Sequence, residues 1–263
     1  MRAPSWTENK VVCGVLGVVG VTLLAELAGR TGLISTDLFP LASTIIAEAI
    51  TLIADPAFLG DIAGTFGAWA AGLALTVLLA VPAGLVLGSV PALEAVARPV
   101  IEFLRPIPSI AIIPLAVFLF PDNLQMKIGV IAYASTWPIL INTIYGVKDV
   151  DPLAKETLRT FGFGRSAVLA RVSLPSAAPF IATGIRIAAG FGLIVAISAE
   201  LISSQESGIG TFILEAGSSP EGVLLTVAAV LWAGVLGLLT NAAFVGAERR
   251  MFRWHTAKTG GAR

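Results

Sequence analysis

Charged residues are scarce in this chain of 263 residues, of which Asp, Glu, Lys and Arg make up 13%. Soluble domains carry about 25% charged residues, so most of the surface of this protein is expected to face lipid. The basic residues form no patch interleaved with aromatic ones, which argues against nucleic-acid binding. Cysteine and histidine occur once each, as Cys13 and His255. A single cysteine excludes an internal disulfide and a cysteine-based metal site, and His255 lies in the polar tail, so we expect no metal site.

The sequence also lacks the motifs of an enzyme. No G-x-x-x-x-G-K-[ST] phosphate-binding loop occurs, and the nearest stretch, GFGRS at 162–166, is too short and has no lysine. Neither H-E-x-x-H nor D-x-x-D is present. We therefore predict a non-catalytic chain that binds no cofactor, so that any ATP and Mg²⁺ would belong to another polypeptide.

What the sequence does contain is a series of long apolar segments. A bilayer core about 30 Å thick needs about 20 apolar residues for each helix that crosses it. Six segments are candidates, at residues 11–27, 62–87, 100–120, 128–144, 180–202 and 224–245. The predicted fold class is therefore an all-α integral membrane protein with six transmembrane helices.

Two features near the N-terminus need separate interpretation. The first apolar segment follows Arg2 and Lys10, as in a signal peptide, but Glu26 and the lack of a clean A-x-A cleavage site favour a retained span. Residues 41–53 have apolar side chains at helical spacing and are too few to cross a bilayer, so we expect a helix at the membrane interface.

No internal repeat stands out. The chain is interpreted as one transmembrane domain, 1–263, in which residues 1–57 are peripheral, residues 58–245 form the core and residues 246–263 form a cytoplasmic tail.

The distribution of Lys and Arg predicts the orientation. With both termini in the cytoplasm, the 17 Lys and Arg residues fall in cytoplasmic segments, except for Arg30 and Lys127 outside and Arg186 within the fifth span. The opposite orientation would place this positive charge outside, against the positive-inside rule. We therefore predict a multi-pass protein with cytoplasmic termini and a cytoplasmic loop between its fourth and fifth spans.

That loop, residues 146–179, combines basic charge with helix signals. Asp151-Pro152 is typical of a helix start, and a short helix is predicted at 153–161. Glycines at 162 and 164 break it, and a second short helix is predicted at 165–172, closed by Leu174-Pro175. A solvated basic loop would explain the charge, but it would not explain two helices that carry apolar residues.

The same loop carries a pattern that resembles a known family. Glu156-Thr157, Gly162 and Val172-Ser173-Leu174-Pro175 match the spacing of E-A-A-x3-G-x9-I-x-L-P, with Thr157 and Leu158 in place of the alanines and Val172 in place of isoleucine. Similar flanking stretches are RPIPSIAIIPLAVF (105–118), PILINTIYGVKDVDP (138–152), GIRIAAGFGLIVAISAELI (184–202) and SGIG (207–210). Over residues 58–245 the chain resembles the membrane permease of bacterial ABC importers, of the type that handles sulfonates, nitrate or taurine.

The resemblance implies the type I importer fold, in which this loop is a coupling helix seated in a groove of a cytoplasmic ATPase. The implied coupling residues are Glu156, Thr157, Leu158, Phe161, Gly162, Val168, Val172, Leu174 and Pro175. The carboxylate of Glu156 is expected to engage basic groups of the ATPase. Burial of each large apolar side chain in the groove would contribute about 1.5–3 kcal/mol.

The resemblance also implies partners, a location and a substrate class. The chain would act in the bacterial inner membrane as a homodimer on an ATPase dimer that binds ATP and Mg²⁺. An external binding protein would deliver a sulfonate, nitrate, taurine or a similar small organic anion. A pyrimidine vitamin precursor is the alternative substrate.

Residues of the translocation path are predicted from helix breakers and polar groups within the spans. Prolines 106, 108 and 114 predict a broken third span that lines the path, although helix packing explains them equally well. The candidates are Pro106, Pro108, Ser109, Asn142, Ser198 and Glu200. Arg186 and Glu200 lie about 21 Å apart along one helix, so they cannot pair. We expect each to reach the nearer membrane surface, or to gate one end of the path.

Two other classes of membrane protein agree less well with the sequence. A stand-alone secondary transporter is expected to have inverted repeats and a coupling carboxylate at the membrane centre, and we find neither. A membrane enzyme would need catalytic motifs of the kind that the chain lacks. The permease interpretation is therefore preferred.

Overall fold

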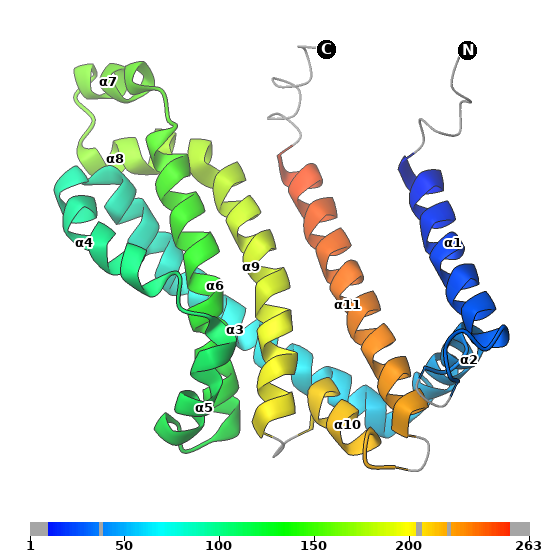
Figure 1. Cartoon of the computed structure of the whole chain (residues 1–263). Helices are drawn as coiled ribbons and strands as arrows, with labels where there is room; N and C mark the ends of the chain where they lie inside the picture. Colours follow the sequence, from blue (N-terminus) through cyan, green and yellow to red (C-terminus); the bar gives the residue numbers. More distant parts are fainter. Residues whose placement is uncertain (1–9, 37–38, 204–206, 220–221, 253–263) are drawn as a thin grey trace, which may run out of the picture.

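The structure is a computed structural model that describes residues 10–36, 39–203, 207–219 and 222–252. The described residues form helices and connecting loops and contain no strand, which confirms the all-α fold class. Three long helices make up the centre: α3 (Pro56–Ser89), α6 (Asn123–Lys148) and α9 (Leu174–Ser203). α6 packs along both of the others (Figure 1).

Small residues bring α3 and α6 close together. Gly84 of α3 lies against Thr143 of α6, where an added Cβ would be 2.6 Å from the Cβ of Thr143. One turn later, a Cβ added at Gly88 would be 2.8 Å from the Cβ of Val147. Both distances are too short for non-bonded carbon atoms, so larger residues would force the helices apart. The Gly-x3-Gly spacing thus serves helix packing within one chain.

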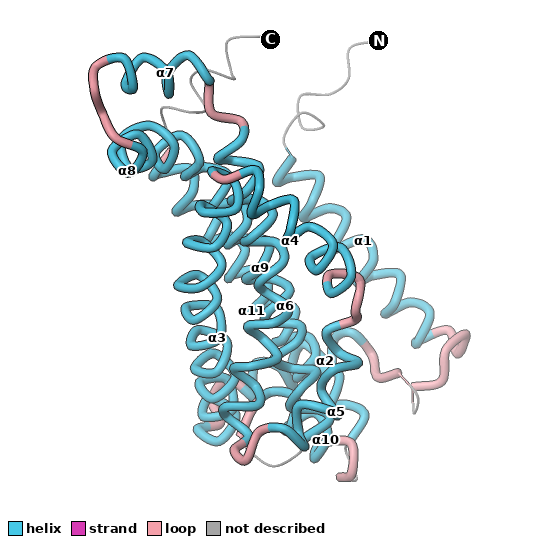
Figure 2. Tube along the Cα trace, turned by 90° about the vertical axis from the view of Figure 1, so that its left-hand side faces the viewer, coloured by secondary structure: helices cyan, strands magenta, loops and turns pink. Residues whose placement is uncertain are grey.

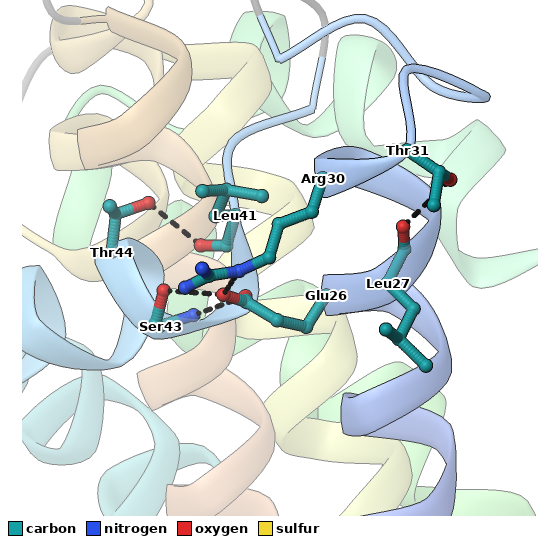
Figure 3. A network of polar contacts seen from close by, with 7 residues as sticks. All are labelled: Glu26, Leu27, Arg30, Thr31, Leu41, Ser43 and Thr44. Carbon is teal, nitrogen blue, oxygen red and sulfur yellow. Dashed lines mark hydrogen bonds and ion pairs between the residues drawn. The ribbon is translucent and has the colours of Figure 1, made fainter.

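The N-terminal helix α1 (Lys10–Arg30) is joined to α2 (Ala42–Leu52) by a polar network (Figure 3). The carboxylate of Glu26 accepts hydrogen bonds from the backbone N–H of Ser43 (3.0 Å) and from its hydroxyl (2.9 Å). Arg30 Nε donates to the same carboxylate at 2.8 Å. The N-cap residue of α2, Leu41, makes no side-chain cap. Glu26 therefore supplies from α1 the negative cap that α2 lacks in its own sequence.

α2 packs against the last helix, α11 (Gly222–Met251). The indole N–H of Trp232 donates to the carbonyl of Ala49 at 2.7 Å. Phe58, near the start of α3, is fully buried in the same apolar cluster. On the other face of α2, Ile46 and Ile50 are exposed. The short helix predicted at 41–53 is therefore confirmed, with one apolar face against the protein and another left uncovered.

The predicted third span is not a single helix. α4 (Pro91–Leu104) and α5 (Ser109–Leu119) are bent by 92° relative to each other. The break falls at 105–108 because Pro106 and Pro108 have no N–H to donate and disfavour helical conformation in the preceding residue. Pro114, also expected to break the span, lies inside α5. By length and composition the described residues contain five spanning helices, or six if the bent pair counts as one.

Several spans extend farther than their hydropathy predicts. α3 begins at Pro56, after Asp55 caps it by accepting the N–H of Ala57 at 2.9 Å. α6 is capped by Asp122, which accepts the N–H of Gln125 at 3.1 Å. The first turn of a capped helix can be polar, so hydropathy does not detect it although it is helical. Lys127, which the charge distribution predicts in an outer loop, therefore lies within α6 and is buried.

The predicted stop at Leu174-Pro175 is wrong. α8 (Arg165–Val168), a π-helical turn (Leu169–Ser173) and α9 follow one another without a break. In this turn the N–H of Leu174 donates to the carbonyl of Leu169, five residues earlier. The wider turn takes the helix past Pro175, which has no N–H and would clash with the preceding turn of a regular α-helix.

The short helices gather at the two ends of the bundle (Figures 1 and 2). α7 (Pro152–Thr160) and α8 lie at one end, together with the start of α1 and the end of α11. α5 and α10 (Ile209–Ala216) lie at the opposite end. Of these, α10 has no counterpart among the elements predicted from the sequence. The beginning of the first span and the end of the last thus share a side with the loop that resembles a coupling helix.

Candidate functional site

The loop between α6 and α9 folds into an elbow, defined here as α7, the turn at Gly162 and α8. α7 starts as its Asp-Pro pair predicts, with Asp151 Oδ1 accepting the N–H of Leu153 at 2.9 Å. At its other end the N–H of Phe163 donates to the carbonyl of Leu158 at 3.1 Å, the long bond of a Schellman motif. Gly162 has φ +83°, a left-handed conformation that glycine adopts without the strain caused by a β-carbon.

The outer face of the elbow carries exposed apolar side chains. Leu153 is 68% exposed and Phe161 is 78% exposed. Glu156 is exposed on the same helix. Large exposed apolar residues on a polar helix favour an interaction surface. Leu153 was not among the coupling residues predicted from the sequence. Its spacing of i, i+4 and i+8 with Thr157 and Phe161 indicates that the three residues share one face of a helix.

The other predicted coupling residues divide into two groups. Thr157, Gly162, Leu174 and Pro175 are exposed, whereas Leu158 and Val172 are partly buried. Val168 is only 4% exposed. The chain itself buries Val168, so a partner has almost none of its surface left to cover. The exposed surface of α7 and the turn that a partner could cover therefore consists mainly of Leu153, Glu156, Thr157 and Phe161.

A cavity of about 360 Å³ lies at the bend between α4 and α5. Arg105 and Ser109 line it from the bend, Trp137 and Asn142 from α6, and Phe191 from α9. The hydroxyl of Tyr133 on α6 donates to the carbonyl of Leu104 at 2.7 Å. This bond satisfies a carbonyl at the broken helix end and holds the bend against α6.

The cavity lies midway along the long helices. Its lining residues on α6 run from Ala134 to Asn142, whereas α6 itself runs from Asn123 to Lys148. At a rise of 1.5 Å per residue, the lining begins about 16 Å from one end of the helix and ends about 9 Å from the other. The cavity therefore lies at the depth of a bilayer core and not at its surface.

Arg105 is the only charged residue among the described residues that line this cavity. The side chain of Arg105 makes no hydrogen bond or ion pair with any described residue. The charge distribution predicts it in a cytoplasmic segment, and the structure places it at the bend between α4 and α5. The indole N–H of Trp137 is buried and also has no hydrogen-bond acceptor among the described residues. A charge at membrane depth is costly and is typically retained for function. Arg105 therefore offers guanidinium donors that no described residue fills.

The predicted path residues are only partly brought together. Ser109 and Asn142 line the cavity, and Pro106 and Pro108 form the break beside it. Asn142 Nδ2 donates a hydrogen bond to the carbonyl of Pro138 at 2.8 Å, and the amide oxygen of Asn142 takes no part in that bond. Ser198 and Glu200 do not line the cavity.

Glu200 instead belongs to a buried network, where its side chain is 1% exposed. Its carboxylate accepts hydrogen bonds from Thr65 Oγ1 at 2.9 and 3.0 Å and from the N–H of Gly210 at 3.0 Å. Lys127 Nζ lies 3.6 Å from Glu200 Oε1 and is 3% exposed. An added Cβ at Gly208 would overlap the carboxyl group, and one at Gly210 would overlap the carbonyl oxygen of Ile197, which explains the two glycines of the SGIG stretch. The network joins α3, α6, α9 and α10.

Arg186 is also paired within the protein. Its Nε donates to Glu248 Oε2 at 2.9 Å, and Thr183 Oγ1 donates to the other oxygen of the same carboxylate at 2.8 Å. The expectation that Glu200 reaches out to the nearer membrane surface is therefore wrong, whereas Arg186 is 31% exposed and reaches Glu248 of α11. Both charges find partners on other helices, which hydropathy along one helix cannot reveal.

These features define a class: a helical membrane domain with a central cavity that carries one charged side chain, and with an exposed helical elbow at one end. Residues 77–253, more than half of the chain, match the family described as the inner membrane component of binding-protein-dependent transport systems. The chain belongs to this family, as the pattern at 156–175 predicted.

Several named permeases are similar to this chain. The bicarbonate transport system permease CmpB of Synechococcus elongatus is 34% identical over 184 residues, which are 70% of this chain and 66% of that protein. A probable ABC transporter permease of Brucella melitensis biotype 1 is 32% identical over 80% of this chain and 85% of its own length. The nitrate import permease NrtB of Leptolyngbya laminosa is 30% identical over 75% of this chain and 74% of its own length. The matched region thus spans just under two thirds of CmpB.

Proposed function

We propose that this chain forms, together with a second copy of itself, the transmembrane path of an ATP-driven importer of small anions such as bicarbonate or nitrate. The elbow and both termini would face the cytoplasm of a bacterial cell, where an ATPase dimer binds ATP and Mg²⁺. An external binding protein would deliver the substrate. Membership of the family and the names of the relatives support this proposal.

The observation that carries the anion assignment is Arg105 at the central cavity. A guanidinium group offers planar pairs of N–H donors that match the oxygens of a carboxylate-like anion. Bicarbonate and nitrate are planar oxyanions of this kind. The hydroxyl of Ser109 adds a neutral donor at the same cavity. A neutral pyrimidine compound would not compensate the charge of Arg105.

The lining of the cavity supports a homodimer. Arg105 is exposed, and Phe191 and Ile187, which also line the cavity, are 55% and 37% exposed. A cavity that opens at membrane depth would meet lipid in a single chain, where its polar groups would be unsatisfied. A second copy related by a two-fold axis would close it with the same surface.

The elbow is proposed as the site where the ATPase docks. We expect the substitution Glu156→Lys to abolish ATP-dependent uptake and co-purification of the ATPase, while the permease still inserts into the membrane. The reason is that reversing the charge would place a cation against the basic groups expected in the ATPase groove, and like charges at an interface cost several kcal/mol. Uptake of labelled nitrate and bicarbonate, and pull-down of the ATPase, measure the two effects.

Glu102→Lys is a matched control for this experiment. Glu102 is a glutamate on α4 with a side chain 71% exposed, outside the elbow. We expect this variant to retain the ATPase. Normal uptake and normal ATPase binding by the Glu156→Lys variant would refute the docking role.

A further inference from the structure

A second cavity, of about 580 Å³, lies on the inner side of the elbow. Its walls are the end of α3, the start of α4, the end of α6, and the helices α7 and α8. Three basic residues line it: Lys155 and Arg159 of α7, and Arg165 of α8. No aspartate or glutamate is among its described lining residues. We call it the elbow cavity.

The elbow cavity is separate from the surface proposed for the ATPase. Lys155 and Arg159 are four residues apart and share one face of α7. Leu153, two residues before Lys155, points about 200° away around the helix, in agreement with its exposure. α7 therefore presents apolar side chains outward and basic side chains to the elbow cavity.

The positive charge of the elbow cavity is not balanced by the protein. Lys155 Nζ donates to the carbonyl of Val147 at 2.9 Å, which carries no full charge. Burial lowers the pKa of the Lys155 ammonium, and the positive charge of Arg159 lowers it further. The side chains of Arg159 and Arg165 make no ion pair or hydrogen bond within the described ranges.

Glu94, an acidic group on the neighbouring helix α4, is already engaged. Glu94 of α4 pairs with Lys148 of α6 at 2.6 Å, so it does not balance the three cations. Like charges four residues apart on a helix are destabilising, and three cations around one cavity repel each other. An anionic ligand would remove this cost.

We propose that the elbow cavity binds a phosphate group, supplied by the head group of an anionic phospholipid or by inorganic phosphate. Phosphate oxygens accept two parallel hydrogen bonds from the N–H groups of an arginine side chain, because the geometries of the two groups match. Three hydroxyl groups among the lining residues add further donors: Ser89, Ser166 and Ser173.

The shape of the elbow cavity favours the lipid as the source. Its volume is that of a site for an extended organic ligand, and apolar residues at the end of α3 and the start of α4 line one side of its wall, including Leu85, Val86, Val90 and Pro91. Basic pockets at the cytoplasmic ends of transmembrane helices suit anionic lipid head groups. A bound head group would connect the elbow to the turn between α3 and α4, and so hold the elbow against the membrane domain.

The test uses the complete transporter, purified with its ATPase. One variant carries Lys155→Gln, Arg159→Gln and Arg165→Gln together. A control variant loses the same charge outside the cavity, through Arg98→Gln, Arg249→Gln and Arg250→Gln. Native mass spectrometry measures the phosphatidylglycerol and cardiolipin that stay bound, against phosphatidylcholine. In a parallel measurement on delipidated protein, thermal unfolding is followed with inorganic phosphate and with chloride at equal ionic strength.

We expect the wild type and the control variant to retain anionic lipid and the cavity variant to lose it. Stabilisation of the wild type by inorganic phosphate alone, lost in the cavity variant, would support the phosphate site and assign it to the soluble ion. Equal lipid retention by all three proteins, together with equal stability in phosphate and chloride, would overturn the proposal. If the triple variant does not assemble, Arg159→Gln alone carries the same test, since that side chain makes no bond within the described residues.

Discussion

Replacing Arg105 by glutamine is expected to reduce the uptake of nitrate or bicarbonate by about 10- to 100-fold. This range corresponds to a contribution of about 1.5–3 kcal/mol from a hydrogen bond to a charged group. Glutamine keeps hydrogen-bonding capacity and much of the length of the side chain, so the variant removes chiefly the positive charge at the central cavity. Transport of labelled anion into proteoliposomes that contain the permease, the ATPase and the binding protein measures the effect.

Two further variants separate charge from structure. Arg105→Lys keeps the charge but loses the planar fork of donors, so we expect uptake between that of the wild type and that of Arg105→Gln. Arg98→Gln removes an arginine from the neighbouring helix, α4, where the side chain is 66% exposed and pairs with Glu102 at 3.5 Å. We expect Arg98→Gln to transport normally, because an exposed ion pair contributes at most about 1 kcal/mol.

The outcomes distinguish the role of Arg105 from the proposed function as a whole. If the wild-type assembly imports an anion and Arg105→Gln imports it equally well, Arg105 does not bind the substrate. If the wild-type assembly with its binding protein and ATP imports neither anion, the substrate class itself is wrong. Binding-protein-stimulated ATP hydrolysis in the Arg105→Gln variant shows whether the assembly is intact.

Features encoded locally in the sequence were predicted well. Asp151-Pro152 starts α7 and Gly162 ends it, because capping and positive φ depend on residues within one turn. The apolar segments placed the long helices for the same reason, since their signal accumulates along one stretch of chain. The path residues Ser109 and Asn142 could likewise be chosen as polar groups within spans, and both line the central cavity.

Features that depend on distant residues were not predictable from one sequence. Lys127 reads as an outer-loop cation, and only the packing of α6 against α9 shows that Glu200 lies 3.6 Å from it. In the sequence, Arg105 is interpreted as a positive charge that flanks a span, and only the 92° bend between α4 and α5 shows that it lines the central cavity. Pro175 reads as a helix stop, because a π-helical turn has no distinct local signature. The burial of Lys127, of Glu200 and of Val168 likewise depends on tertiary contacts, which one sequence does not show.

The buried pair of Lys127 and Glu200 is expected to give the largest effect on stability. Lys127→Met leaves the buried carboxylate of Glu200 without this cation, and Glu200→Gln takes one anionic partner from the buried Lys127. Losing one side of a buried ion pair costs about 3–5 kcal/mol. We therefore expect both Lys127→Met and Glu200→Gln to lower the unfolding temperature of the purified permease strongly. The two side chains are 3% and 1% exposed, so water cannot replace the missing partner.

The double variant Lys127→Met with Glu200→Gln makes this prediction specific. It removes both charges of this pair, and the amide oxygen of glutamine can still accept the bonds from Thr65 and from the N–H of Gly210. Buried ion pairs are often replaceable by neutral groups at little cost, so the double variant is expected to be more stable than either single variant. A double-mutant cycle of thermal unfolding in detergent measures this coupling. Strictly additive losses would show that the two charges do not stabilise each other.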